Sequence, residues 1–174
     1  TSILAKGTAK NDTIDISNAA TVSSTVFTGG GSDTVDVTGS ATAVNTFKFT
    51  TTTLNAGDLA AGDAVTIDAS NFGAAGGQVI LDFTSAIEGL LNVGGSALSA
   101  ATGNVDIVAA TLGNTTNVAA TASGTGAVLQ FDLNGDGAYI AADDAQITLT
   151  GVAGAGNETL VYNAANDNFV FTIV

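Results

Sequence analysis

Short runs in which apolar and polar residues alternate dominate this chain. In residues 78–83 every second side chain is apolar, and in residues 44–49 Phe47 and Phe49 flank Lys48, which gives an extended backbone an apolar face. The same alternation, or a short apolar run bounded by Gly, Asn, Asp or Ser, predicts eleven strands, at residues 13–16, 24–27, 34–37, 44–49, 64–67, 78–83, 105–109, 127–131, 146–149, 159–162 and 169–174. Strands of this length and spacing favour an all-β fold, either a short-strand β-sandwich or a β-roll or solenoid-like unit.

Helix is expected to be scarce. Residues 84–91 place Ile87, Leu90 and Leu91 on one face of a helix, and residues 55–61 are expected to form a turn. No proline-rich or charged linker divides the chain, so we predict one compact unit over residues 1–174. A soft boundary is expected within residues 103–126, which are rich in Asn, Thr, Ala and Gly.

Composition adds an expectation about the core. The chain is 45% apolar, but Ala and Val supply most of that fraction, with eight Phe, two Tyr and neither Trp nor Met. We therefore expect a thin core made of small side chains.

Charge narrows the range of partners. Sixteen carboxylates face three Lys, so the formal net charge is −13 at pH 7. Nucleic acids and anionic membranes are poor partners for such a chain, whereas hard divalent cations relieve the repulsion between clustered carboxylates. The absence of Cys and His excludes disulfides, thiolate metal sites and the usual general base. No apolar stretch is long enough to span a membrane, and no N-terminal signal peptide pattern is present.

Residues 132–143 carry the clearest functional motif. Asp132, Asn134, Asp136 and Asp143 occupy positions 1, 3, 5 and 12 of an EF-hand-type calcium loop, Gly137 occupies position 6, and Ala138 at position 7 would offer its carbonyl oxygen. The loop resembles those of dockerin modules and extracellular calcium-binding repeats, because it ends in Asp rather than Glu. We expect calcium affinity of about 10⁻⁴ to 10⁻³ M. The alternative is that Asn134-Gly135 and Asp136-Gly137 are simply turn dipeptides between two strands.

Two glycine-rich segments near the N-terminus suggest further calcium sites. Residues 28–36 (TGGGSDTVD) nearly match the nonapeptide of calcium-binding β-rolls, and residues 7–15 (GTAKNDTID) are a degenerate copy. These segments resemble the repeats-in-toxin family of secreted proteins, and the resemblance implies Asp33 and Asp36 as calcium ligands. The two copies lie 21 residues apart, not a multiple of nine, which argues against a long regular roll. Alternatively, Asp12 and Asp33 only begin strands, and Asp58, Asp63 and Asp68 are solvated turn residues.

The C-terminal segment supports the same family resemblance. Residues 166–174 (NDNFVFTIV) resemble the uncleaved C-terminal signal of type I secreted proteins, which implies secretion and folding in extracellular calcium. Residues 127–174 would then combine the calcium loop with a secretion signal. Alternatively, residues 169–174 form a terminal strand that completes a sheet. With no charged residue after Asp167, such a strand could also pair with a sheet edge of another copy.

Three functional hypotheses follow. The first is an extracellular, calcium-binding structural protein that self-assembles into a surface layer, filament or matrix at the cell surface. The second is the C-terminal or ligand-binding domain of a type I secreted adhesin. An enzyme is not expected, because the chain lacks His, Cys and Arg and its recognisable acids lie in calcium-loop patterns.

Overall fold

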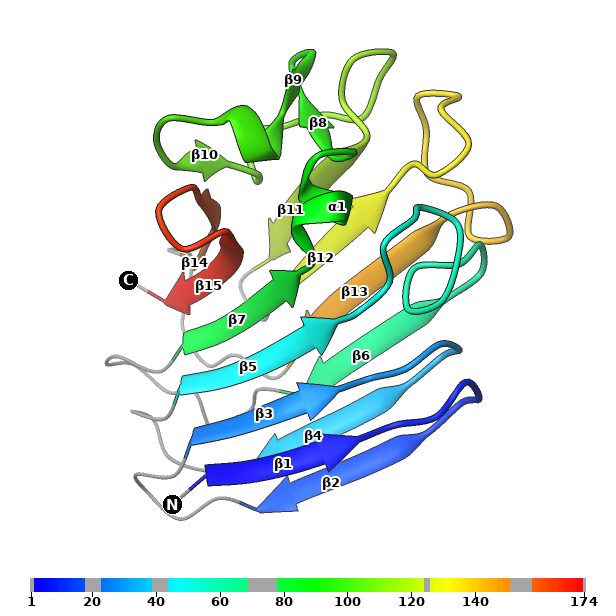
Figure 1. Cartoon of the computed structure of the whole chain (residues 1–174), viewed down its shortest axis with the longest axis vertical. Helices are drawn as coiled ribbons and strands as arrows, with labels where there is room; N and C mark the ends of the chain where they lie inside the picture. Colours follow the sequence, from blue (N-terminus) through cyan, green and yellow to red (C-terminus); the bar gives the residue numbers. More distant parts are fainter. Residues whose placement is uncertain are drawn as a thin grey trace.

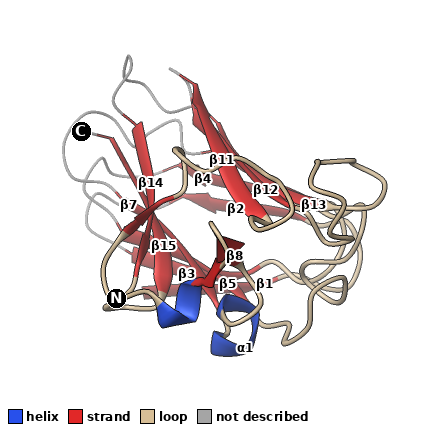
Figure 2. Ribbon diagram, turned by 90° about the horizontal axis from the view of Figure 1, so that it is seen from above, coloured by secondary structure: helices blue, strands red, loops and turns tan. Residues whose placement is uncertain are grey.

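Two β-sheets face each other across a hydrophobic core in the computed structural model (Figures 1 and 2). The structure describes residues 2–17, 23–38, 44–68, 78–123, 126–150 and 158–173. The fold is all-β, as the sequence predicts, and its two helical segments are single turns: α1 (Ser85–Glu88) and the 3₁₀ turn η1 (Leu98–Ala100).

Sheet A, as described, has seven strands. In spatial order they are β1 (Ser2–Lys6), β3 (Ser23–Phe27), β5 (Val44–Phe49), β7 (Gln78–Phe83), β15 (Asn168–Ile173), β14 (Glu158–Asn163) and β10 (Val105–Asp106).

Sheet B has six strands within the same residues. In spatial order they are β11 (Val118–Ser123), β12 (Gly126–Phe131), β13 (Ala145–Thr150), β6 (Ala64–Asp68), β4 (Thr34–Thr38) and β2 (Thr13–Ser17). A small hairpin of β8 (Asn92–Val93) and β9 (Ser96–Ala97) lies near α1 (Figure 1).

The first seven strands alternate between the two sheets and wind as a short parallel roll. Ser2 pairs with Ser23 in sheet A and Thr13 pairs with Thr34 in sheet B, so the first turn of this roll is 21 residues long; the pairs β4–β6 and β5–β7 further on are 32 and 34 residues apart. The spacing that argued against a nine-residue repeat is therefore the length of a wider turn, which contains two strands and two connections. Figure 1 shows the turns stacked from the N-terminal end upwards.

The C-terminal half completes both sheets with antiparallel strands. β15 lies between β7 and β14, with Phe169 opposite Leu81 on one side and opposite Tyr162 on the other. The predicted terminal strand completes a sheet: β15 has a hydrogen-bonded neighbour on each side and so offers no free edge to another copy. Val174 lies outside the described residues. In the described part of the chain, β1 and β2 are edge strands at the N-terminal end of the roll.

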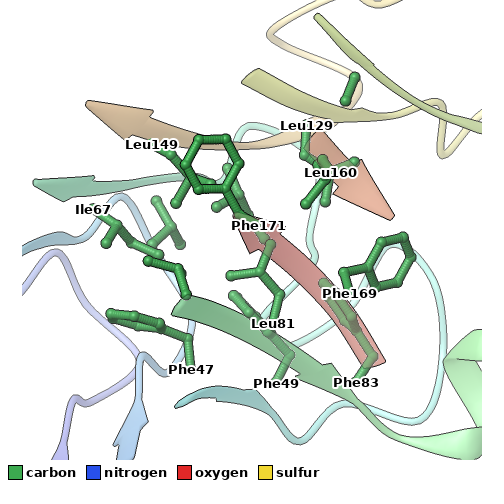
Figure 3. Close-up of a cluster of buried hydrophobic side chains, with 14 of the residues drawn as sticks. Phe47, Phe49, Ile67, Leu81, Phe83, Leu129, Leu149, Leu160, Phe169 and Phe171 are labelled. Atoms are coloured by element: carbon green, nitrogen blue, oxygen red, sulfur yellow. The ribbon is translucent and has the colours of Figure 1, made fainter. Parts of the chain in front are cut away.

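Large side chains fill the core, contrary to the expectation of a thin core of Ala and Val. The inward positions of β5, β6 and β7 alternate strictly with outward ones, so each strand contributes two or three core residues. Phe83 stacks on Phe49 and meets the edges of Phe131 and Phe169. Figure 3 shows Phe49, Phe83 and Phe169 within this cluster of buried side chains. Phenylalanines are few, but most of them gather in one place: Phe47, Phe49, Phe83, Phe131, Phe169 and Phe171 are all buried.

Each of the eleven predicted strands overlaps an observed one, but the sequence missed four: β1, β8, β9 and β11. The predicted strand at 105–109 is reduced to β10. The predicted helix at 84–91 is confirmed only over α1, after which Gly89 caps the turn and leaves Leu90 42% exposed. Ile87 and Leu91 are buried as expected. Residues 103–126, expected to be loose, contain β10 and β11, while Gly124 and Thr125 lie outside the described residues.

Candidate metal site

An aspartate directly precedes each of four neighbouring parallel strands of sheet B. Asp12, Asp33, Asp63 and Asp144 come immediately before β2, β4, β6 and β13, and we call these four residues the aspartate column. Backbone bonds tie its members to adjacent strands: the N–H groups of Thr34, Thr66 and Gln146 donate to the carbonyl oxygens of Asp12, Asp33 and Asp63 at 2.9, 2.8 and 3.0 Å. The turns that carry the column lie along one side of the molecule in Figure 1.

Glycines allow the first two of these turns to stack closely. A Cβ atom on Gly7 would lie 1.9 Å from the carbonyl oxygen of Thr28, and one on Gly29 would lie 1.8 Å from that of Thr8. Gly29 also has a φ of +80°, in the left-handed region that favours glycine. In each of the two repeat-like segments, a glycine therefore lets a backbone carbonyl oxygen of the other segment come close, beside the aspartate column.

Asp33 is the most deeply buried acid of the turns that precede β2, β4 and β6. Its side chain is 1% exposed; Oδ1 accepts the backbone N–H of Asp12 at 2.9 Å, while Oδ2 has no hydrogen-bond partner. Burial raises the pKa of Asp33 to about 6; the Asp12 N–H lowers it, and the carboxylates of Asp12, Asp63 and Asp58 raise it. The hydroxyl of Thr28, which is fully buried in the same turn, also lacks a partner.

The neighbouring acids are held by the backbone of the same turns. Asp63 accepts N–H groups from Gly31 and Ala60 at 3.1 and 2.9 Å, and burial is the main cause that raises its pKa. Asp58 accepts from the N–H and hydroxyl of Thr50. A depression of about 570 Å³ opens beside Asp58 and Asp63, lined otherwise by glycines and small residues of the three turns. The only ion pair of the described residues, Lys48 with Asp82, lies elsewhere, in sheet A.

The loop at 132–143 is folded around Asp132. This carboxylate is 3% exposed and accepts the N–H groups of Gly135 and Gly137 at 2.6 and 2.8 Å. Both glycines have positive φ, of 78° and 86°, as the calcium-loop pattern requires. Asn134 and Asp136 are exposed and each closes a small turn by accepting a backbone N–H, the second from Ala138 at 2.9 Å.

The acid that closes this loop is Asp144, not the neighbouring Asp143. Asp144 is fully buried, and its two oxygens accept the N–H groups of Leu133 and Ile140 at 2.8 and 2.7 Å. Asp143, the predicted ligand at position 12, is exposed. The signal that sequence reasoning missed is the aspartate just before a strand, which Asp144 shares with Asp12, Asp33 and Asp63.

Asp33 and Asp36 do not share a site. Asp36 points outward from sheet B, where it stands in register between Asp15 on β2 and Asp68 on β6. Burial raises the pKa of Asp36, and the carboxylates of Asp68 and Asp15 raise it further. The sequence therefore predicted two acids that the fold separates into the aspartate column and an outer row.

The donor set suits a hard cation at Asp33 better than at Asp132. In the part of the chain that the structure describes, no three acidic side chains are arranged as a metal site by themselves. An ion at Asp33 would need the partnerless Oδ2 together with hydroxyl and backbone carbonyl oxygens of the stacked turns, which are the ligands that Ca²⁺ accepts. At Asp132 both carboxylate oxygens already accept N–H groups, so the loop holds its shape through its own hydrogen bonds.

Comparison with known protein families, with characterised proteins and with solved structures gives no match. No helix among the described residues is both long and apolar enough to cross a membrane. Function therefore has to be argued from the turns themselves.

Proposed function

We propose that the protein is an extracellular structural module whose glycine-aspartate turns bind calcium. The observation that carries the proposal is Asp33: a carboxylate that is 1% exposed, has an oxygen without a partner and lies close to three other acids. A buried charge without a partner is costly, and a divalent cation removes that cost without needing any cationic side chain. The net charge of −13 favours cation uptake over the whole molecule.

Calcium would act on the fold by mass action. An ion that binds the folded turns and not the unfolded chain stabilises the fold by about 2.7 kcal/mol when its concentration is one hundred times the dissociation constant. Weak sites of the expected affinity fill only where calcium is millimolar, which is the extracellular condition. This reasoning, together with the resemblance to repeats-in-toxin proteins and type I secretion signals, supports a secreted, cell-surface location.

Calorimetric titration and thermal unfolding test the calcium proposal. We expect heat of binding and a raised melting temperature with Ca²⁺, a weaker response to Mg²⁺, which demands stricter octahedral geometry, and none with Na⁺ at equal ionic strength. An equal response to all three salts would show charge screening instead of site binding and would contradict the proposal.

Self-assembly is the second part of the proposed function, and the N-terminal edge favours it. Ile3, Ala5 and Ile14 occupy inward positions of the first turn of the roll but are only partly buried, whereas Val26 and Val35 one turn further on are fully buried. Leu4 beside them is 63% exposed. Repeat folds need a cap at such an end, and a second copy that pairs its own β1 and β2 edges would supply one.

Substitutions at two exposed leucines test whether assembly uses the β1–β2 edge or any exposed apolar side chain. We expect the protein in millimolar calcium to form dimers or larger assemblies by light scattering, and Leu4→Lys to shift them to monomers. Leu90→Lys is the matched control, because Leu90 is also exposed but lies beyond α1 at 42% exposure. A monomeric wild-type protein, or an equal effect of both variants, would contradict assembly through β1 and β2.

A further inference from the structure

The short helix α1 places one acidic side chain inside the protein. α1 follows β7 directly; Thr84 caps its start by accepting the N–H of Ile87 at 3.4 Å, and the Thr84 hydroxyl also donates to the carbonyl oxygen of Thr51 at 2.7 Å. Ile87 is fully buried, and Glu88 beside it is only 1% exposed. The helix α1 thus buries an apolar side chain, Ile87, and a carboxyl group, Glu88, next to each other.

Glu88 meets the hairpin of β14 and β15. The fully buried Tyr162 of β14 hydrogen-bonds to Glu88, and its hydroxyl also lies 3.4 Å from a carboxylate oxygen of Asp167 in the hairpin turn. The Glu88 Oε1 atom is buried without any hydrogen-bond partner. The Tyr162 ring packs edge-on against Phe169 at 5.3 Å, so an apolar wall backs the hydroxyl.

The charged groups around Glu88 are almost all acidic. Asp167 faces it from the hairpin turn and Asp82 from β7, while η1, which packs against α1, contributes only Leu, Ser and Ala. Asp82 is itself paired with Lys48 on β5. Tyr162 remains protonated, because burial and the two neighbouring carboxylates raise its pKa.

One phenolic hydrogen therefore serves two acceptors, Glu88 and Asp167. If Glu88 is ionised, its Oε1 is a buried charge without a partner, next to two other carboxylates. If Glu88 is protonated, its charge disappears. Its carboxyl hydrogen then joins the phenolic hydrogen of Tyr162 as a second donor among the three side chains. Burial, followed by the charges of Asp167 and Asp82, raises the pKa of Glu88 to about 7, against a lowering effect of the Tyr162 hydrogen bond.

We propose that Glu88 is a proton-operated latch, which when protonated holds α1 against the β14–β15 hairpin and when ionised releases it. The two states differ at one contact: protonated Glu88 can donate a hydrogen bond, whereas ionised Glu88 repels the Asp167 carboxylate and keeps only its hydrogen bond with Tyr162. Because the folded carboxyl takes up its proton near neutral pH and the released one near 4.5, the closed state gains population as the pH falls from 8 to 6. The gain over that interval is about tenfold.

Selective labelling can follow this group directly, because the chain contains only two glutamates, Glu88 and Glu158. In protein with ¹³C-labelled glutamate side chains, the Glu88 carboxyl resonance, identified by its loss in Glu88→Gln, is expected to titrate with a midpoint near pH 7. Tyr162→Phe removes the hydrogen bond that favours the ionised form, so the midpoint should move to higher pH. A midpoint below pH 5 in the wild-type protein would overturn the proposal.

Hydrogen exchange tests the release itself. After correction for intrinsic rates, the amides of residues 87–91 and 163–168 should exchange about tenfold faster at pH 8 than at pH 6. Glu88→Gln keeps a neutral donor in place, so its exchange at pH 8 should match that of the wild-type protein at pH 6. Equal protection of the wild-type protein at both pH values would show that ionisation does not open the contact, even if the carboxyl titrates as expected.

Discussion

Replacing Asp33 with Asn separates the cost of a buried charge from the benefit of a bound cation. The substitution keeps the size of the side chain and the acceptor for the Asp12 N–H, which binds Oδ1 at 2.9 Å, but removes the charge at the partnerless Oδ2. Without calcium the variant should be more stable than the wild-type protein at pH 8. With calcium the order should reverse, because the variant cannot offer a carboxylate to the ion.

The size of the effect follows from the pKa. A rise from 3.8 to about 6 corresponds to about 3 kcal/mol of unfavourable charge burial above pH 6. The new amide leaves one donor unsatisfied at a cost of about 1 kcal/mol, so the net gain is about 2 kcal/mol. For a chain of this length that is a rise in melting temperature of about 4–8 °C in chelator.

The pH dependence of unfolding independently tests whether the charge of Asp33 destabilises the fold. The pKa of folded Asp33 lies above its unfolded value, so the stability of the wild-type protein falls as the pH rises from about 4 to about 6 and then stays level. The advantage of Asp33→Asn should therefore vanish at pH 4, where both side chains are neutral. Thermal unfolding by circular dichroism at pH 4 and pH 8, with chelator or with 10 mM calcium (roughly ten times the weakest expected dissociation constant), measures all four cases.

Asp106→Asn is the matched control, because it makes the same change in net charge at an exposed aspartate. It should shift stability by less than about 0.5 kcal/mol in every condition. If Asp33→Asn lowers stability in chelator at pH 8, or responds to calcium as fully as the wild-type protein does, the reasoning about the buried carboxylate is wrong.

Other substitutions address the calcium loop and the stacked turns. Asp132→Ala should lower the melting temperature with or without calcium, because the N–H groups of Gly135 and Gly137 lose their acceptor, while calcium binding at Asp33 persists. A loss of the calorimetric calcium signal in this variant would instead place the ion in the loop at 132–143. Asp144→Ala should cost about 2–3 kcal/mol in urea unfolding, because it removes a fully buried carboxylate that accepts the N–H groups of Leu133 and Ile140. Asp143→Ala, at an exposed position, should cost less than about 0.5 kcal/mol. Equal costs would contradict the role of Asp144 as the acid that closes the loop. Gly29→Ala should lower the free energy of unfolding by about 1–3 kcal/mol more than Gly94→Ala does. Both glycines have positive φ, but only a Cβ on Gly29 would meet a carbonyl oxygen. A similar loss in both variants would mean that the turns do not need close stacking.

Local signals in the sequence were sufficient for most strands. Alternation with period two located β5 and β7 to the residue, because each has one face in the core and one in solvent. β11 was missed because its sequence, Val-Ala-Ala-Thr-Ala-Ser, has little contrast between its two faces and resembles a loop in composition. β1 was missed for a related reason, since its Leu4 points into solvent.

Long-range pairing could not be predicted from the same signals. The sequence showed the 21-residue interval between two Asp-Thr-aliphatic-Asp units, but only the register of β2 with β4 shows that this interval is one full turn of the roll. Likewise, nothing local in residues 169–174 indicates that β7, almost ninety residues earlier, is their partner. The aspartate column became visible only when strands distant in sequence were placed side by side, although each member already stood just before an apolar run.

The position of β15 sets an order of events for a chain that is made and delivered from one end to the other. The roll of β1 to β7 pairs strands that are close in sequence, 21 residues apart in its first turns, so it can begin to form early, with a small cost in loop closure. Sheet A can be completed only later, because β15, the strand between β7 and β14, is formed by residues 168–173. Until β15 arrives, β7 presents an open edge and Phe83 lacks its contact with Phe169. Folding should therefore show a slow final phase that depends on residues 168–173, and a chain held up before that point would be the form most prone to aggregate.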